Sequence, residues 1–408
     1  MDTPDFSSSE FLSTHIKQTL AFYHPQCIDR KSGGFYHYFR DNGEIYDTET
    51  RHLVSSARFV FNYAMAASNL HNSVEEQAAY LEATQHGIRF LRRQHLDPDL
   101  DGYAWVLHGD TVIDGTNHCY GLAFVLLAYA TALKAGIQEA KQYLEECFNL
   151  MERHFWDTNY GLYRDEISAD WKTVSTYRGQ NANMHSCEAM IAAYQATGNE
   201  VYLDRAFTVA HNICVRQANL SDGMIWEHYH EDWRVDPDYN REDPKNLFRP
   251  WGFQPGHFTE WAKLLLLLRE YRKEEWLLPL ARGLFDTALG KAWDFENGGI
   301  CYGFAPDGSI CDSDKYFWVQ AESLAAAAML GEALNNNNYR DWYQRIWNYS
   351  WNHMIDHEYG AWYRILNRQN EKYDALKSPA GKTDYHTMGA CYEALRTLHR
   401  DKTGAQYG

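Results

Sequence analysis

The chain has 408 residues, a hydrophobic fraction of 45% and a formal net charge of −17. This apolar fraction is sufficient for a large core. The acidity argues against nucleic acid or an anionic membrane as a partner, because clustered Lys and Arg recruit such partners. Aromatic residues make up 15% of the chain, and their flat faces suit the stacking of sugars as well as packing between helices.

The N-terminal stretch MDTPDFSSSEF lacks a basic region followed by an apolar one, so no signal peptide is expected. No segment approaches the roughly 18 consecutive apolar residues of a membrane span. The eight cysteines are scattered and form no CxxC pair. This pattern is typical of reduced thiols, and we expect a cytoplasmic protein.

One short phrase recurs six times along the chain, as a glycine-containing turn followed by aromatic and β-branched residues. The copies are GGFYHYF (33–39), DGYAWVL (101–107), YGLYRDE (160–166), DGMIWEH (222–228), GGICYGF (298–304) and YGAWYRI (359–365). Each copy is typical of a short hairpin or strand. The spacing of about 60 to 75 residues predicts six structural repeats.

Helical patterns lie between these phrases, and six of them are rich in Ala or Leu and apolar on most sides. They cover residues 51–70, 120–136, 184–199, 257–271, 321–334 and 386–400. Others, such as 78–95, 140–156 and 202–217, are amphipathic. The two sets predict an all-α fold, an (α/α)6 barrel of six helix-hairpin repeats with short β-hairpins between repeats.

No Pro-, Ser- or Gly-rich linker divides the chain. A helical protein of two domains is the competing interpretation, but such a protein would be expected to carry a linker of that kind. We therefore expect residues 1–408 to form one catalytic domain.

Polar residues interrupt the apolar helices near their N-terminal ends. They are Arg51, His52 and Arg58; His118 with Tyr120; His185 and Glu188; His257 and Glu260; Gln320 and Glu322; and His386. One such residue would be explained as a cap or a hydrogen-bonded core residue. A ring of them in phase with the repeat is costly unless it lines a wet cavity, so we expect a ligand site at one mouth of the barrel. Arg51 and Glu322 are the members most easily explained by structure alone.

The segment GFQPGHFTEWAKLLLLL (252–268) shows this pattern most clearly. Pro255 and Gly256 predict a turn, with the helix following from His257. His257 and Glu260 then share one face of the first turn, where Glu260 is in reach of His257 or of a substrate hydroxyl. The leucines after them form the buried wall of the fourth repeat.

The chemistry that suits this ring is proton transfer. Histidine takes and gives protons near neutral pH, and the positive end of the helix dipole disfavours imidazolium at His257 and His386. Two neutral histidines on different sides of a cavity fit abstraction of a proton next to a carbonyl and its return. Arg58 and Arg249 could stabilise the enediolate oxygens that develop.

Competing chemistries have weaker support. The chain has no HExxH, Walker A, GxSxG or strand-linked GxGxxG motif, and the pair His228 and His230 lacks an evident carboxylate, so we expect neither a metal nor a cofactor. An inverting glycoside hydrolase remains an alternative, with its acid and base drawn from Glu188, Glu260 and Glu322. A sugar-binding module without catalysis is the remaining option.

Several segments resemble the N-acylglucosamine 2-epimerase superfamily, and most closely its aldose–ketose isomerase branch. They are RHLVSSARFVFNYA (51–64), YRGQNANMHSCEA (177–189), WEHYHEDWRVDPDYN (226–240), FRPWGFQPGHFTEWAKLL (248–265), WVQAE (318–322) and DYHTMGACYEA (384–394). The resemblance covers essentially the whole chain. It implies an (α/α)6 barrel that isomerises an unmodified hexose, most simply D-mannose to D-fructose, through a cis-enediolate without metal. A mannose/glucose 2-epimerase using the same site remains open.

The resemblance also implies roles for single residues. His386 matches the histidine that moves the proton between C2 and C1, and His257 matches the one that opens the ring or acts as a base on the other face. Positions that resemble those holding or stacking on the sugar are Arg58, Asn181, His185, Arg249, Glu260 and Trp318, with Tyr120 a less secure match. No role follows from the resemblance for His118, and the oligomeric state is not implied.

Overall fold

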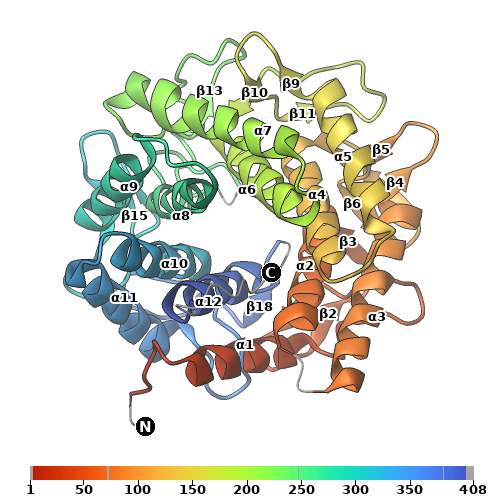
Figure 1. Cartoon of the computed structure of the whole chain (residues 1–408), viewed down its shortest axis with the longest axis horizontal. Coiled ribbons are helices and arrows are strands. Elements are labelled where there is room, and N and C mark those ends of the chain that lie inside the picture. The colour runs from red at the N-terminus through yellow and green to blue at the C-terminus, as the bar shows by residue number, and fades with distance from the viewer. Residues whose placement is uncertain (1–2, 71–72, 247, 380, 401–408) are drawn as a thin grey trace.

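The computed structural model describes residues 3–70, 73–246, 248–379 and 381–400. Within them, twelve α-helices form two concentric rings (Figure 1). The inner helices are α2 (Leu53–Asn69), α4 (Cys119–Lys134), α6 (Gln180–Thr197), α8 (Pro255–Tyr271), α10 (Phe317–Ala333) and α12 (Tyr385–Leu398). The outer helices are α1 (Ser9–Tyr23), α3 (Val74–Phe90), α5 (Ala140–His154), α7 (Glu200–His211), α9 (Leu277–Ala292) and α11 (Asn337–Tyr349).

The inner ring is closed, because each inner helix contacts the next and α12 contacts α2. Each outer helix packs on one inner helix, and α1 packs on α12, so the first and last helices complete a repeat together. The burial of each helix follows its apolar content, and the largely apolar α4 is buried continuously from Gly121 to Leu133. By contrast, α5 buries only one face, which includes Leu144, Cys147 and Met151. The predicted (α/α)6 barrel is confirmed.

Three inner helices, α6, α8 and α10, begin two or more residues earlier than the sequence pattern predicts, and this places polar residues in their first turns. α6 begins at Gln180 and α10 at Phe317, each four residues before its apolar run. The predicted turn at Pro255 and Gly256 is wrong, because both residues belong to α8. Proline is tolerated at the first helical position, where its missing N–H has no intrahelical partner to lose.

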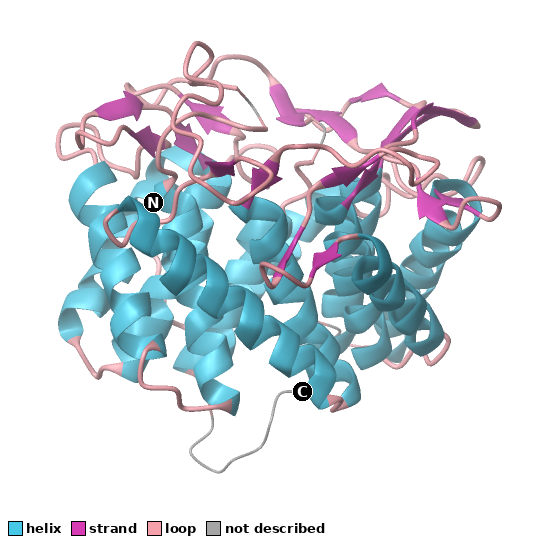
Figure 2. Cartoon of the chain, turned by 90° about the horizontal axis from the view of Figure 1, so that it is seen from above, coloured by secondary structure: helices cyan, strands magenta, loops and turns pink. Residues whose placement is uncertain are grey.

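The strands are short and gather at one end of the helical barrel (Figure 2). They are β1 (Tyr38–Arg40), β2 (Ile45–Asp47), β3 (Thr50–His52), β4 (Leu96–Asp97), β5 (Gly102–Tyr103), β6 (Val106–His108), β7 (Thr111–Asp114), β8 (Asn117–His118), β9 (Trp156–Asp157), β10 (Leu162–Tyr163), β11 (Glu166–Ile167), β12 (Arg178–Gly179), β13 (His228–Tyr229), β14 (Gly303–Phe304), β15 (Ile310–Asp312), β16 (Lys315–Tyr316), β17 (Ile365–Leu366) and β18 (Leu376–Ser378). Two sheets have three antiparallel strands, in the orders β18-β1-β2 and β3-β6-β7, and the other strands pair in twos.

The recurring phrases form hairpins that follow the outer helices. Five antiparallel pairs occupy equivalent places: Ile28 with Phe35, Leu96 with Tyr103, Trp156 with Tyr163, Trp293 with Ile300, and Ile355 with Trp362. An aspartate begins each of these turns and accepts backbone N–H bonds, as Asp294 does from Glu296 and Asn297. In the fourth repeat a 3₁₀ turn at Ala218–Ser221 takes this place.

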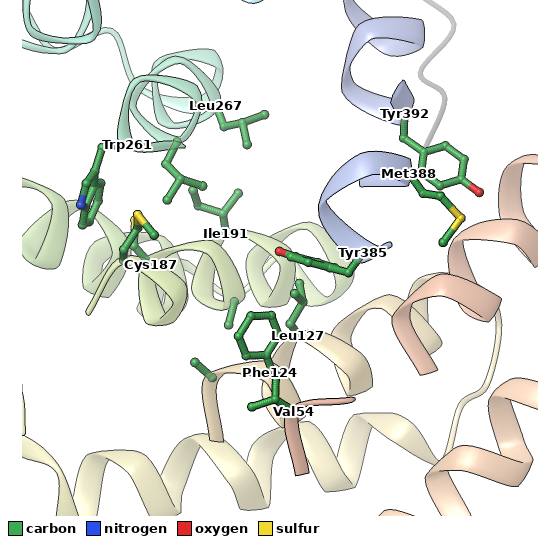
Figure 3. Packing of buried hydrophobic residues seen from close by; sticks show 14 of the residues in the cluster. Val54, Phe124, Leu127, Cys187, Ile191, Trp261, Leu267, Tyr385, Met388 and Tyr392 are labelled. Carbon is green, nitrogen blue, oxygen red and sulfur yellow. The ribbon is translucent and has the colours of Figure 1, made fainter. Parts of the chain in front are cut away.

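Aromatic and aliphatic side chains from neighbouring inner helices fill the centre of the barrel (Figure 3). Phe124 of α4 and Tyr385 of α12 meet edge to face, with ring centroids 5.4 Å apart. The eight cysteines are free thiols, seven of them buried, as expected for reduced side chains. No helix in the described part of the chain is long and apolar enough to cross a membrane.

Candidate active site

A cavity of about 400 Å³ lies where the first turns of the inner helices meet the strand loops. This volume falls in the range of small-molecule sites. The cavity is lined by all nine residues that the sequence singled out as candidates: Arg58, Tyr120, Asn181, His185, Arg249, Glu260, His257, Trp318 and His386. His52 and His118 line it too.

Arg51 and Gln320 have structural roles outside the cavity wall. Arg51 forms a buried ion pair with Asp29 at 2.8 Å. Gln320 exchanges two hydrogen bonds with the backbone of Ile300. Arg51 is therefore explained by structure alone, and Glu322 does not line the cavity either, although its carboxylate contacts His386.

His386 is held at both ring nitrogens. Its Nδ1 lies 2.7 Å from Glu322 Oε1, and its Nε2 lies 3.3 Å from the guanidinium of Arg58. Because a guanidinium only donates, Nε2 accepts and the proton lies on Nδ1, facing the carboxylate. Burial, then Arg58 and His185, lower the pKa of His386 well below 6.5. The imidazole is therefore neutral, with its basic nitrogen toward the cavity.

Arg58 is fixed by its surroundings. Its guanidinium lies between the rings of Phe124 and Tyr385, 4.2 and 4.9 Å from their centroids. It also donates to the carbonyl of Gly381 and, at 3.2 Å, to the hydroxyl of Tyr120. A positive charge is thus held beside His386.

His257 has a different carboxylate partner from the one expected. Its Nδ1 lies 3.0 Å from Glu227 Oε2, and that oxygen also accepts from Gln180 at 2.9 Å. Glu227 belongs to the loop before β13, whereas Glu260 lies on the same helix as His257. Of the two options for Glu260, the structure gives the contact with His257 Nδ1 to Glu227 instead, and a bond from Glu260 to a substrate hydroxyl stays a prediction.

Trp318 lies between the two histidines. Its ring centroid is 5.0 Å from that of His257 and 5.7 Å from that of His386. An aromatic plane flanked by two imidazoles offers a stacking surface with a proton-transfer group on either side. The two histidines thus face one shared space from α8 and α12.

Glu260 is buried and neither carboxyl oxygen has a hydrogen-bond partner within the described residues. Its nearest basic neighbour in the site is His185, at 3.9 Å. Burial, then Glu322, raise the pKa of Glu260 well above 4.5. A protonated carboxyl facing the cavity can donate a hydrogen bond to a polar ligand.

Two buried trios are compact enough for a metal ion, with ligand atoms within 4.8 Å of one another: His185, Glu188 and Glu260; and Glu260, Glu322 and His386. The positive charge beside these carboxylates is a side chain of the protein, because the ammonium of Lys263 lies 2.6 Å from Glu322 and 3.7 Å from Glu188. We assign neither trio to a metal.

The rim of the cavity contains a second charged group. Arg249 pairs with Glu166 and donates a hydrogen bond to the hydroxyl of Tyr239 at 3.0 Å, while its guanidinium covers the ring of Tyr177. His118 stacks on Trp105 with centroids 3.9 Å apart. Burial lowers the pKa of His118 to about 4. Arg249 is thus held at the wall, whereas Arg58 lies against His386.

Sequence reasoning missed several residues of this arrangement, among them Glu227, Trp105 and Tyr302 in the cavity lining and Lys263 behind it. Glu227 had a signal, since it is the acidic residue in the recurring phrase DGMIWEH. Lys263 lies in the apolar run of α8, and nothing in the sequence except its charge indicated a role in the site.

The family model for N-acylglucosamine 2-epimerase (GlcNAc 2-epimerase) matches residues 34–390, and the chain belongs to this family. It is 58% identical to the D-mannose isomerase of Marinomonas mediterranea over 399 residues, covering 98% of this chain and 100% of that one. A crystal structure of D-mannose isomerase superposes with a TM-score of 0.94 at 58% identity, covering 97% of this chain and 100% of the other.

The same fold occurs in the cellobiose 2-epimerase of Spirochaeta thermophila, with a TM-score of 0.83 at 24% identity and 96% of each chain covered. The family and the isomerase class expected from the sequence are thus confirmed.

Proposed function

We propose that this enzyme interconverts D-mannose and D-fructose by proton transfer through a cis-enediolate. The observation that carries the proposal is that His257 and His386 both lie close to the ring of Trp318 in one cavity, each with a carboxylate on Nδ1. The similarity over the full chain to D-mannose isomerase supports the choice of sugar. We further propose that residues 1–408 act as one catalytic domain in the cytoplasm, without metal or cofactor.

In this mechanism Trp318 stacks on the sugar and His257 assists opening of the pyranose ring. His386 Nε2 then removes the proton from C2 and returns it to C1, while the hydroxyl proton on O2 is transferred to O1. Glu322 stabilises the imidazolium that forms in between, as a carboxylate on Nδ1 does in other histidine bases. The aldehyde carbon is reduced and the hydroxyl-bearing carbon oxidised, with no external electron carrier.

Arg58 and Glu260 stabilise the oxygens. The enediolate carries negative charge on oxygen, and a fixed guanidinium beside the base lowers the energy of that charge in a cavity of low dielectric. Glu260, in its protonated form, donates to a substrate oxygen. Tyr120, Asn181, His185 and Arg249 complete the polar lining and hold hydroxyl groups.

The hydrolase alternative fits less well. Inverting hydrolysis needs two carboxyl groups about 6.5–9.5 Å apart with a water between them, whereas oxygens of Glu260 and Glu322 lie within 4.8 Å of each other. Both oxygens of Glu322 are also engaged, by His386 and Lys263. The carboxylates of Glu322 and Glu188 instead hold the Nδ1 atoms of His386 and His185.

The test is incubation of mannose with the enzyme in deuterated water, followed by NMR. We expect fructose as the main early product. Glucose formed with little fructose would instead identify a 2-epimerase, which returns the proton to the opposite face of C2.

The histidine variants provide the second half of this test. His386→Asn is expected to abolish both turnover and deuterium exchange at C2. Retention of activity in His386→Asn and His257→Asn, with release of reducing ends from disaccharides, would favour the hydrolase.

A further inference from the structure

Lys263 is buried in the wall behind the cavity. It lies on α8 within the run AKLLLLL, its side chain is 8% exposed, and it does not line the cavity. Its ammonium lies 2.6 Å from Glu322 Oε2 and 3.7 Å from Glu188 Oε1. An apolar side chain would pack there without the cost of removing a charge from water.

Each of these carboxylates also contacts a histidine of the cavity. Glu322 Oε1 lies 2.7 Å from His386 Nδ1, and Glu188 Oε2 lies 3.1 Å from His185 Nδ1. These contacts form one continuous series of ionisable side chains, in the order His386, Glu322, Lys263, Glu188, His185. It joins α12, α10, α8 and α6.

We propose that Lys263 is a positioning residue: an internal cation that keeps Glu322 and Glu188 ionised, so that His386 and His185 carry their proton on Nδ1, and whose own charge disfavours a second proton on either ring. The inference rests on the proposed function, because a base at His386 has meaning only for proton transfer. Without Lys263, Glu322 and Glu188 would face each other in a medium of low dielectric, and a proton would be taken up to reduce the repulsion.

Burial raises the pKa of Glu322, and the charge of Lys263 is the largest influence that lowers it. Although burial opposes it, Glu322 and Glu188 raise the pKa of Lys263. Lys263 in turn is among the charges that lower the pKa of His386, after burial, Arg58 and His185. The titratable and charged groups around His386 come from every inner helix: Arg58 (α2), Tyr120 (α4), His185 and Glu188 (α6), Glu260 and Lys263 (α8), Glu322 (α10) and Tyr385 (α12).

The test is the pH dependence of kcat in Lys263→Met. Loss of the positive charge favours imidazolium at His386, so the acidic limb of the kcat profile should move to higher pH by about one unit. At pH 7 we expect kcat to fall by about tenfold or more, with KM changed less than about threefold, because Lys263 does not line the cavity.

Two variants serve as matched controls. Lys263→Arg keeps the charge and should keep the position of the acidic limb. Leu264→Met changes the next buried residue of α8 at nearly constant volume and should leave the profile unchanged. An equal fall of kcat at every pH in Lys263→Met, with the limb unmoved, would overturn the proposal in favour of a packing role.

A measurement without turnover separates this inference from the proposed function. In ¹⁵N-labelled protein, with His386 assigned through His386→Asn, we expect a neutral ring protonated at Nδ1. In Lys263→Gln, which retains a hydrogen-bond donor and serves if the Met variant does not fold, the ring should become protonated at higher pH. An unmoved His386 titration would refute the positioning role even if mannose proved to be the substrate. A moved titration would support it whichever sugar is converted.

Discussion

The protonation state of Glu260 sets it apart from the other carboxyl groups of the site. Glu322 and Glu227 each contact a histidine, and Glu188 contacts both His185 and Lys263. Glu260 has no hydrogen-bond partner among the described residues, its nearest histidine nitrogen is 3.9 Å away in His185, and its pKa is raised by burial and by Glu322. Buried polar groups without partners are costly, so this one is expected to find its partner in the ligand.

A pair of substitutions at Glu260 tests this assignment. A glutamine resembles a neutral carboxyl in shape and keeps a donor, so Glu260→Gln should retain kcat/KM within about tenfold of the wild type. Glu260→Ala removes the donor and should cost about 100-fold. Steady-state kinetics on mannose measures both, and equal losses in the two variants would show that the ionised form is needed.

The packing of the first turn of α8 explains why position 256, in the segment PGH, is a glycine. A Cβ on Gly256 would lie 2.6 Å from Cζ3 of Trp318 and 2.7 Å from Cγ2 of Val319. Such contacts are too close, so the missing side chain lets α10 approach α8 and lets the Trp318 ring reach the cavity. Pro255 begins the helix, and His257 then points at the same ring.

Gly256→Ala should therefore displace Trp318 and raise KM for the sugar by about tenfold, since a shift of about 1 Å in a positioning group is costly. Gly290→Ala is the matched control, because Gly290 lies in α9 with nothing within 4 Å of an added Cβ. It should leave KM unchanged and stabilise the fold by about 0.5–1 kcal/mol. If KM is also unchanged in Gly256→Ala, the ring is not positioned by this contact.

At the scale of the whole molecule, the barrel buries many neutral histidines. The pKa of each of the following is lowered, with burial as the largest cause: His15, His37, His52, His95, His118, His185 and His386. A group with a lowered folded pKa stabilises the fold above its unfolded pKa, and that stability is lost as the pH falls. Burial raises the pKa of Asp165 to about 8, so this carboxyl group stabilises the fold at lower pH, but seven histidines have the opposite effect.

The free energy of unfolding should therefore fall as the pH decreases from 6.5 toward 4.5. Urea unfolding at a series of pH values measures this slope, to which one histidine contributes about 1.4 kcal/mol per pH unit. His15, whose pKa is lowered to about 4, accepts a hydrogen bond from the indole N–H of Trp362 at 2.9 Å and does not line the cavity. His15→Gln should reduce the slope by one such contribution, and stability that increased below pH 6.5 would contradict the account.

Much of this molecule could be predicted from its sequence. The phrases and apolar runs predict six repeats and a closed barrel, because helix period and turn chemistry are local properties. Polar residues in phase predict which end of the barrel carries the cavity. His257 and His386 follow from that phase and from the resemblance to the family.

Only the tertiary structure decided how these residues are paired. Glu227 reaches His257 from a loop, and Lys263 joins two histidine–carboxylate pairs from four helices. Neither contact follows from spacing along the chain, because loop geometry and the packing of inner helices set which buried polar groups meet. The local pattern of the chain is enough to predict the barrel and the polar ring, whereas the three-dimensional packing sets which histidine meets which carboxyl group.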